Sequence, residues 1–114
     1  MELRENLVVC IGSPMTDITA RVPYEFLQKY KLKPNNATSY NQDYSDIFDD
    51  LQEYGSTSSA GGSITNTVLS VQNSLSLPNV CCYLGAIGND DFGREIRQNL
   101  ISSNVMLLSW CDWK

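Results

Sequence analysis

Two short apolar runs that each end at a glycine constrain the fold of this chain most. Residues 7–11 precede Gly12, and residues 80–84 precede Gly85. Neither run alternates between apolar and polar side chains, which is typical of strands buried on both faces of a parallel sheet. Because helical patterns follow these runs, the sequence predicts an α/β layer whose parallel strands are joined by crossover helices.

The region between the two runs contains a second kind of strand. Residues 18–22 alternate apolar and polar side chains, which predicts a half-exposed strand in a small separate sheet. Three further elements are expected: a helix beginning at Pro23, a short strand over residues 37–40, and a helix over residues 44–54 followed by Gly55. The acidic residues of that last helix are interpreted as a solvated helix face rather than a metal site. They are Asp46, Asp49, Asp50 and Glu53.

Two longer helices with apolar faces are predicted in the second half of the chain. The first is expected to begin after Gly62 with Ser63 as its N-cap, and the second to begin at Asn89 or Asp90. A final strand is expected over residues 105–109. The apolar faces are Ile64, Val68, Val71 and Leu75 in the first helix, and Phe92, Ile96 and Leu100 in the second.

Charge and composition argue against nucleic acid and membranes as partners. The 114 residues carry a formal net charge of −5, and their eight Lys and Arg residues form no basic stripe. No apolar run approaches the roughly 18 residues of a membrane-spanning helix, and residues 1–6 do not resemble a signal peptide. We therefore expect one small domain in a cytoplasmic protein, with the nucleus as the alternative location. Because the sequence lacks histidine and Cys-x-x-Cys pairs, Cys10, Cys81 and Cys82 are interpreted as reduced core residues rather than zinc ligands.

Polar residues near the glycines are predicted to meet at one edge of the sheet. Asp17 follows the first apolar run, and Asn66 lies in the first turn of the helix after Gly61-Gly62. Ligands bind beyond the carboxyl ends of strands in open α/β sheets, and helix starts commonly face the same edge. A carboxylate accepts hydrogen bonds and an amide both donates and accepts, so the pair suits a vicinal diol or a sugar. The alternative interpretation is that both stretches are only turns and helix caps.

Three motifs resemble the PfkB, or ribokinase-like, family of sugar and nucleoside kinases, and within it the adenosine kinases. They are Gly-Ser-Pro-Met-Thr-Asp-Ile at residues 12–18, Ala-Gly-Gly-Ser-Ile-Thr-Asn at residues 60–66, and Gly-Ala-Ile-Gly-Asn-Asp-Asp-Phe-Gly at residues 85–93. Residues 26–35 are similar to the lid helix and turn of adenosine kinases.

The resemblance implies a ribokinase-like α/β fold, with part of a doubly wound parallel sheet and a small β-sheet lid. The large domain would comprise approximately residues 7–12 and 61–104. The lid would comprise approximately residues 16–42, 56–60 and 105–113. The resemblance also implies that Asp17, Gly62 and Asn66 contact ribose hydroxyls and that the Gly61-Gly62 pair is the hinge of the lid. Ser13, Met15, Gly61 and Ser63 complete the implied nucleoside site.

The implied reaction transfers the γ-phosphoryl group of ATP to the 5′-hydroxyl of adenosine, with Mg²⁺ as a further cofactor. In this family the catalytic base is an aspartate in a late Gly-Ala-Gly-Asp segment, and the ATP and Mg²⁺ sites belong to the same later region. The sequence contains no such segment. We therefore assign no catalytic residue and no metal ligand to these residues, and we expect the chain alone to be inactive.

Departures from the family pattern leave the nucleoside open. Ser13 stands where adenosine kinases usually have asparagine, and Thr38 and Ser39 stand where they usually have aliphatic residues. Inosine, guanosine, another ribosyl compound or another sugar of the PfkB family are therefore alternatives. A further alternative is a non-catalytic nucleoside-binding or interaction fragment. Such a fragment would expose sheet edges and one apolar face and would tend to self-associate.

Overall fold

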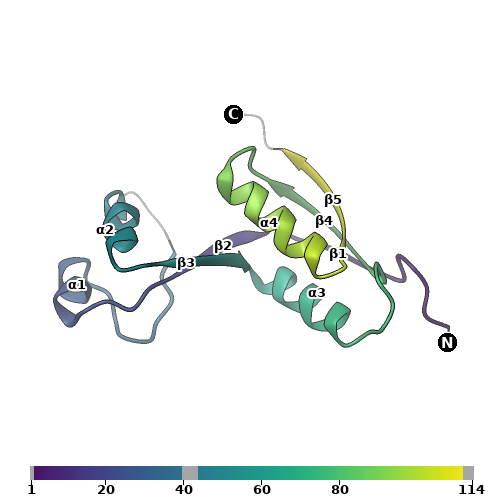
Figure 1. Cartoon of the computed structure of the whole chain (residues 1–114), viewed down its shortest axis with the longest axis horizontal. Coiled ribbons are helices and arrows are strands. Elements are labelled where there is room, and N and C mark those ends of the chain that lie inside the picture. The colour runs from purple at the N-terminus through teal and green to yellow at the C-terminus, as the bar shows by residue number, and fades with distance from the viewer. Residues whose placement is uncertain (1, 40–43, 112–114) are drawn as a thin grey trace. The chain divides into compact units, whose positions relative to one another are not determined.

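The computed structural model describes residues 2–39 and 44–111 and divides the chain into two compact units (Figure 1). Unit 1 comprises Met1–Asp17 and Ser59–Lys114, and unit 2 comprises Ile18–Ser58. Unit 1 is therefore discontinuous in sequence, and unit 2 is inserted between its two segments.

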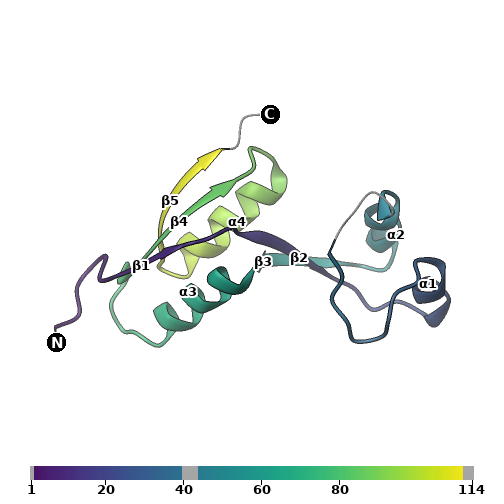
Figure 2. The ribbon, with the colours of Figure 1, turned by 180° about the vertical axis from the view of Figure 1, so that it is seen from behind.

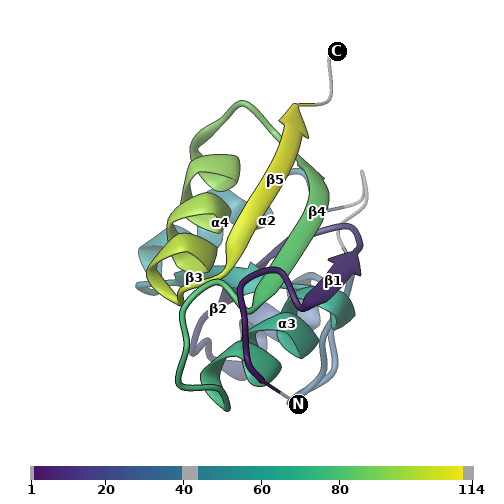
Figure 3. The same cartoon turned by 90° about the vertical axis from the view of Figure 1, so that its right-hand side faces the viewer.

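Unit 1 is built on a three-stranded parallel sheet with the strand order β1-β4-β5. These strands are β1 (Val8–Ile11), β4 (Cys81–Ile87) and β5 (Met106–Cys111). The register places Ile11 beside Leu84 and Leu84 beside Leu108. Figure 3 shows β4 between the two outer strands. The predicted α/β fold with a parallel sheet is confirmed.

Two helices cover one face of this sheet, α3 (Ser63–Asn73) and α4 (Asp91–Ser102). The core lies between them and the sheet, where Cys81 and Tyr83 of β4 meet Val68 of α3 and Leu100 of α4. Alternate residues of β1 point away from this core and are exposed. The prediction that residues 7–11 are buried on both faces is therefore wrong, because the described residues place helices against only one face.

The buried face of α3 differs from its predicted apolar stripe. Val68 is fully buried, but Ile64 is 39% exposed, and the helix ends before Leu75. The side chains buried beside Val68 are the polar Thr65 and Gln72. Both are hydrogen-bonded, which removes the free-energy cost of burying an unpaired polar group. Hydropathy alone cannot reveal such residues as part of the core.

Gln72 connects the end of α3 to the start of β4. Its Oε1 accepts a hydrogen bond from the Cys81 backbone N–H at 2.9 Å. Its Nε2 donates to the Leu77 carbonyl oxygen at 2.8 Å. The side chain therefore satisfies backbone groups that the turn between helix and strand leaves unpaired.

The start of α4 agrees with its predicted cap. Asp90 is the N-cap, and its carboxylate accepts a hydrogen bond from the Gly93 backbone N–H at 2.8 Å. Ile96 and Leu100 are buried as predicted, whereas Phe92 is exposed. This cap fixes where the chain leaves β4 and enters the helix.

A second, two-stranded sheet pairs β2 (Met15–Thr19) with β3 (Thr57–Gly61). The predicted small second sheet is thus present, although β2 begins before residue 18. Residues 37–39 form no strand, contrary to the prediction, and Tyr40 lies outside the described residues. The strand β3 is rich in Ser, Thr and Gly, so no apolar alternation marks it in the sequence.

The final strand requires a correction of the predicted domain division. Residues 105–113 are expected in the lid, but β5 pairs with β4 in the parallel sheet of unit 1. Residues 112–113 lie outside the described residues. The physical reason is the crossover through α4, which returns the chain parallel to β4 and beside it. The assignment of the two units to a large domain and a lid stays a prediction.

Unit 2 contains two short helices, α1 (Tyr24–Lys29) and α2 (Ile47–Glu53), which lie side by side (Figure 2). Asp50 of α2 joins them, because Lys29 Nζ lies 2.5 Å from its Oδ2 and the Tyr30 hydroxyl donates to the same oxygen at 2.6 Å. The hydrogen bonds from Lys29 and then Tyr30 lower the pKa of the Asp50 carboxyl below its ordinary value. Phe26 is buried against Tyr30 and Tyr54.

Candidate functional site

The two glycine-bearing stretches of the sequence lie against each other in unit 1. Gly61, the last residue of β3, lies so close to Asp17 of β2 that a side chain at position 61 would overlap the Asp17 carboxylate. The absence of a Cβ at Gly61 therefore creates the space that this carboxylate occupies. Gly61 itself is buried, whereas Asp17 is exposed at the surface.

Gly62 turns the chain from β3 into α3. Its backbone φ is +97°, a conformation that side-chain-bearing residues rarely adopt, and it is the N-cap of the helix. A Cβ at this position would lie 3.1 Å from the Ser13 carbonyl oxygen and 3.8 Å from Met15 Cγ. The residues preceding Asp17 therefore pack directly on the turn that begins α3.

The same two stretches meet again at Gly12 and Ile64. A Cβ at Gly12 would lie 2.7 Å from the Cβ of Ile64, so the Ile64 side chain fills the space above Gly12. This contact explains why Ile64 does not join the core formed by Val68. It holds the end of β1 against the first turn of α3, as expected for two motifs at the same sheet edge.

Two hydrogen bonds fix this arrangement from the core side. Thr65 Oγ1 and the Tyr83 hydroxyl lie 3.0 Å apart, and both side chains are fully buried. Asn99 of α4 accepts a hydrogen bond from the Ala60 backbone N–H at 3.2 Å through its Oδ1. Residues 60 and 65 flank the Gly61-Gly62 turn, so the turn is anchored on both sides.

The sequence does not predict these anchoring residues. Thr65 lies within the glycine-pair motif without any sign of burial, and the pattern around Tyr83 predicts only an apolar strand. The available signal was the placement of one polar hydroxyl in each of two segments predicted to pack together. Asn99 carried no signal, because it lies on a polar stretch of α4.

The polar groups at the surface of this edge match a neutral, hydroxyl-rich ligand. Ser63 and Asn66 are exposed in the first turn of α3, where the first backbone N–H groups have no acceptor within the helix. The Asn66 backbone N–H donates to the Gly62 carbonyl oxygen at 2.9 Å, as in any regular helix. Its side-chain amide and the Asp17 carboxylate make no hydrogen bond to another described residue. A carboxylate, an amide and helix N–H groups together offer both acceptors and donors.

Other groups of described residues offer less evidence of a functional site. Among the described residues, no group of three or more Cys, Asp or Glu side chains is placed to hold a metal ion. Cys10, Cys81 and Cys82 are free thiols, and burial raises the pKa of the Cys81 thiol, which favours its unreactive protonated form. Nowhere in residues 2–39 and 44–111 is a helix long and apolar enough to cross a membrane.

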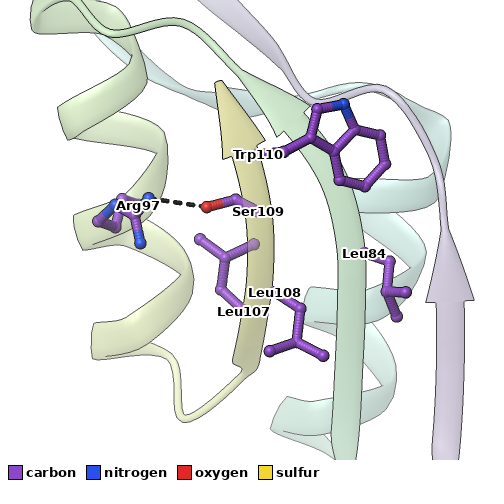
Figure 4. A pocket seen from close by; sticks show the side chains of 6 residues that line it. All are labelled: Leu84, Arg97, Leu107, Leu108, Ser109 and Trp110. Carbon is purple, nitrogen blue, oxygen red and sulfur yellow. Dashed lines mark hydrogen bonds between the residues drawn. The ribbon is translucent and has the colours of Figure 1, made fainter. Parts of the chain in front are cut away.

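An open pocket of unit 1 is lined by residues of β4, α4 and β5 (Figure 4). Arg97 of α4 donates a hydrogen bond to Ser109 Oγ at 2.7 Å on one side of the strand. The pocket is otherwise mostly apolar, and its lining residues are Leu84, Arg97, Leu107, Leu108, Ser109 and Trp110.

Comparison with known proteins finds relatives of which this chain spans only a part. Adenosine kinase 1 of Arabidopsis thaliana is 28% identical over 102 residues, which are 89% of this chain and 30% of the relative. Adenosine kinase of Saccharomyces cerevisiae is 34% identical over 94 residues, which are 78% of this chain and 27% of the relative. The chain thus spans about a third of the length of the curated relatives it matches. No protein-family profile matches the sequence.

Solved structures give the same result. Adenosine kinase of Schistosoma mansoni in complex with adenosine superposes with a TM-score of 0.87 and 28% identity over 99% of this chain and 33% of that chain. The similarity in sequence and in fold thus agrees with the family resemblance carried by the three motifs at residues 12–18, 60–66 and 85–93. The chain belongs to the ribokinase-like (PfkB) family, as a relative of adenosine kinases over about a third of their length.

Proposed function

We propose that this chain forms the nucleoside-binding portion of an adenosine kinase-like enzyme. The observation that carries the proposal is the position of the Asp17 carboxylate, which lies over Gly61 beside the start of α3. Similarity to adenosine kinases over most of the chain supports it, including similarity to a relative solved with adenosine bound.

In this proposal Asp17 accepts hydrogen bonds from the 2′- and 3′-hydroxyls of the ribose. The Asn66 amide and the backbone at Gly62 contact the same sugar, and Ser13, Met15, Gly61 and Ser63 complete the wall of the site. The glycine pair acts as the hinge between the large domain and the lid. Lid closure would exclude water, which otherwise competes with the acceptor hydroxyl for the phosphoryl group.

The proposed reaction of the complete enzyme moves the terminal phosphoryl group of ATP to the 5′-oxygen of adenosine and releases ADP and AMP. ATP and Mg²⁺ would bind outside these residues, because the described chain offers no metal-binding cluster and no phosphate-loop motif. The proposed contribution of this chain is to hold and orient the nucleoside, which is a large part of catalysis in phosphoryl transfer. We accordingly propose that the chain alone has no kinase activity and that the protein acts in the cytoplasm.

The test uses NMR titration to measure nucleoside binding to the purified 114-residue chain. Adenosine is compared with 2′,3′-dideoxyadenosine, which lacks the diol, and with inosine and guanosine, which test the base. Asp17→Asn is expected to weaken adenosine binding at least 10-fold, because a charged hydrogen bond contributes about 1.5–3 kcal/mol. Asp49→Asn is the matched control, since Asp49 is an exposed carboxylate of α2. Equal binding of adenosine and the dideoxy compound, or an unchanged affinity in Asp17→Asn, would refute the assigned role.

A further inference from the structure

The third family motif, residues 85–93, contributes nothing to the proposed nucleoside site, but it determines where α4 begins. A Cβ at Gly93 would overlap the backbone carbonyl of Gly88, so the first turn of the helix packs directly on the turn that follows β4. The Asp90 carboxylate caps the same helical turn. Two turns further along, the fully buried Leu100 holds the helix in the core. The motif and this core contact therefore fix the position of α4.

Asn99 is the side chain through which α4 contacts the glycine-pair motif. Its Oδ1 accepts a hydrogen bond from the Ala60 backbone N–H at 3.2 Å, although the two residues are 39 positions apart in the sequence. Its Nδ2 donates to the Glu95 carbonyl oxygen, one helical turn earlier, at 3.0 Å. Because both ends of the amide are hydrogen-bonded, its oxygen is presented to Ala60 in a fixed orientation.

The Ala60 N–H depends on this acceptor. Ala60 is only 8% exposed and belongs to β3, whose strand partner within the described residues is β2. Its N–H nevertheless donates to a side chain of α4. Buried backbone donors are nearly always paired, and a buried donor that loses its acceptor destabilises the fold. Without the Asn99 amide, the end of β3 would have to move until this N–H reached water or another acceptor.

Movement at Ala60 would be transmitted to the Asp17 carboxylate. Gly61 follows Ala60 directly, and it lies so close to Asp17 that a Cβ at position 61 would overlap the carboxylate. The carboxylate makes no hydrogen bond to another described residue that would hold it independently. The space available to Asp17 is therefore set by the backbone at Gly61.

We propose that Asn99 is a positioning residue of the nucleoside site. It holds Ala60, and with it Gly61, where the Asp17 carboxylate can meet the 2′- and 3′-hydroxyls of a ribose. The inference rests on the proposed function, because it assigns Asn99 to the same site. It gives the third motif a part in recognising the diol, through the placement of α4, although no residue of that motif touches the nucleoside.

The experiment measures the diol preference, defined as the affinity for adenosine divided by the affinity for 2′,3′-dideoxyadenosine. NMR titration of the 114-residue chain gives both affinities. Asn99→Leu keeps the bulk of the side chain and removes the acceptor. It is expected to lower the diol preference about 3- to 10-fold, less than Asp17→Asn does, because the carboxylate itself remains. Asn99→Asp keeps the acceptor oxygen, so its diol preference should stay within about 2-fold of that of the unsubstituted chain.

Gln72→Leu is the matched control for loss of a side-chain acceptor. The Gln72 amide also accepts a hydrogen bond from a buried backbone N–H, that of Cys81 at 2.9 Å, but it lies at the opposite end of α3 from Gly62. This variant is expected to be destabilised as Asn99→Leu is, and to keep its diol preference. If Asn99→Leu does not fold, Asn99→Ala takes its place, because the smaller side chain lets water reach the Ala60 N–H. The same direction of change is expected.

Amide hydrogen exchange tests the contact without a ligand. Exchange at Ala60, relative to the amides of β4, should accelerate at least about 10-fold in Asn99→Leu. It should not accelerate in Gln72→Leu.

Three results would overturn this inference and leave the proposed function intact. The first is an unchanged diol preference in Asn99→Leu despite faster exchange at Ala60. The second is an equal loss of preference in Gln72→Leu, which would make the effect one of general stability. The third is a loss in Asn99→Asp as large as in Asn99→Leu, which would exclude the acceptor oxygen as the cause. Failure of the proposed function is distinguishable, because the unsubstituted chain would then bind adenosine and the dideoxy compound equally, and the inference about Asn99 would fall with it.

Discussion

The buried hydroxyl pair of Thr65 and Tyr83 provides a quantitative test of how the Gly61-Gly62 turn is anchored. Both side chains are fully buried, and their hydroxyls lie 3.0 Å apart. Thr65→Val keeps the shape of the side chain but leaves the Tyr83 hydroxyl buried without this partner. A buried polar group that loses its partner costs about 1–3 kcal/mol, which is a decrease of about 5- to 150-fold in the folding equilibrium constant.

Removing the other hydroxyl of the pair, in Tyr83→Phe, is expected to destabilise the fold less than Thr65→Val does. In Tyr83→Phe the Thr65 hydroxyl can turn to the carbonyl oxygen of Gly62, the N-cap residue three positions earlier. The double variant removes both hydroxyls, so its destabilisation should be smaller than the sum of the single effects. The expected coupling free energy is about 1 kcal/mol.

Urea denaturation followed by fluorescence and far-UV circular dichroism measures the cycle. Thr67→Val is the control, because it makes the same substitution at an exposed position of the same helix, and it should change stability by less than about 0.5 kcal/mol. If Thr65→Val lowers the free energy of unfolding by less than about 0.5 kcal/mol, the hydrogen bond does not anchor the start of α3. The same conclusion follows if the destabilisations of the two single variants simply add in the double variant.

Two further predictions concern the candidate site and the acidic helix. Gly61→Ala introduces a Cβ where the Asp17 carboxylate now lies, so we expect it to reduce adenosine affinity about as much as Asp17→Asn does. Combining the two substitutions should cause no further loss of affinity. Titration of the two single variants and the double variant with adenosine measures this, and additive losses would contradict it. The pKa of Asp50 is lowered by its hydrogen bonds from Lys29 and Tyr30, so its contribution to stability is present above the ordinary carboxyl pKa of about 3.9 and is lost as pH falls through the lower folded value. Asp50→Asn should remove this acid-dependent step from the stability profile of unit 2, measured by NMR between pH 2 and 6, and an unchanged profile would count against the ion pair.

Local patterns predicted much of the fold of unit 1. The apolar runs predicted the two strands β1 and β4, and Asp90 predicted the start of α4, because both signals depend on nearby residues only. The burial of β1 was mispredicted for a different reason. An apolar run reports that a strand can be covered on both faces, but it does not report which polypeptide supplies the cover.

The sequence predicted the position of the candidate site but not the buried contacts that stabilise it. Strand order alone predicted that Asp17 and Gly61 lie at the same edge of the sheet, because strand ends and helix starts meet there. The close approach of the carboxylate to Gly61 and the hydroxyl pair beneath it depend on packing between segments distant in sequence. Such contacts leave no periodic signal, and polar residues such as Thr65 and Gln72 look like surface residues until their partners are known.

The insertion of unit 2 between two segments of unit 1 has a consequence for how such proteins can change. The chain leaves unit 1 through β2 and returns through β3, and these strands are paired with each other. Both ends of the inserted unit are therefore held together regardless of its length, and the entropic cost of closing a loop rises only slowly with the number of residues in it. Replacing residues 20–56, which lie between β2 and β3, with a longer, shorter or unrelated segment thus leaves the register of the parallel sheet untouched, so this position can accept new recognition elements without rebuilding the core.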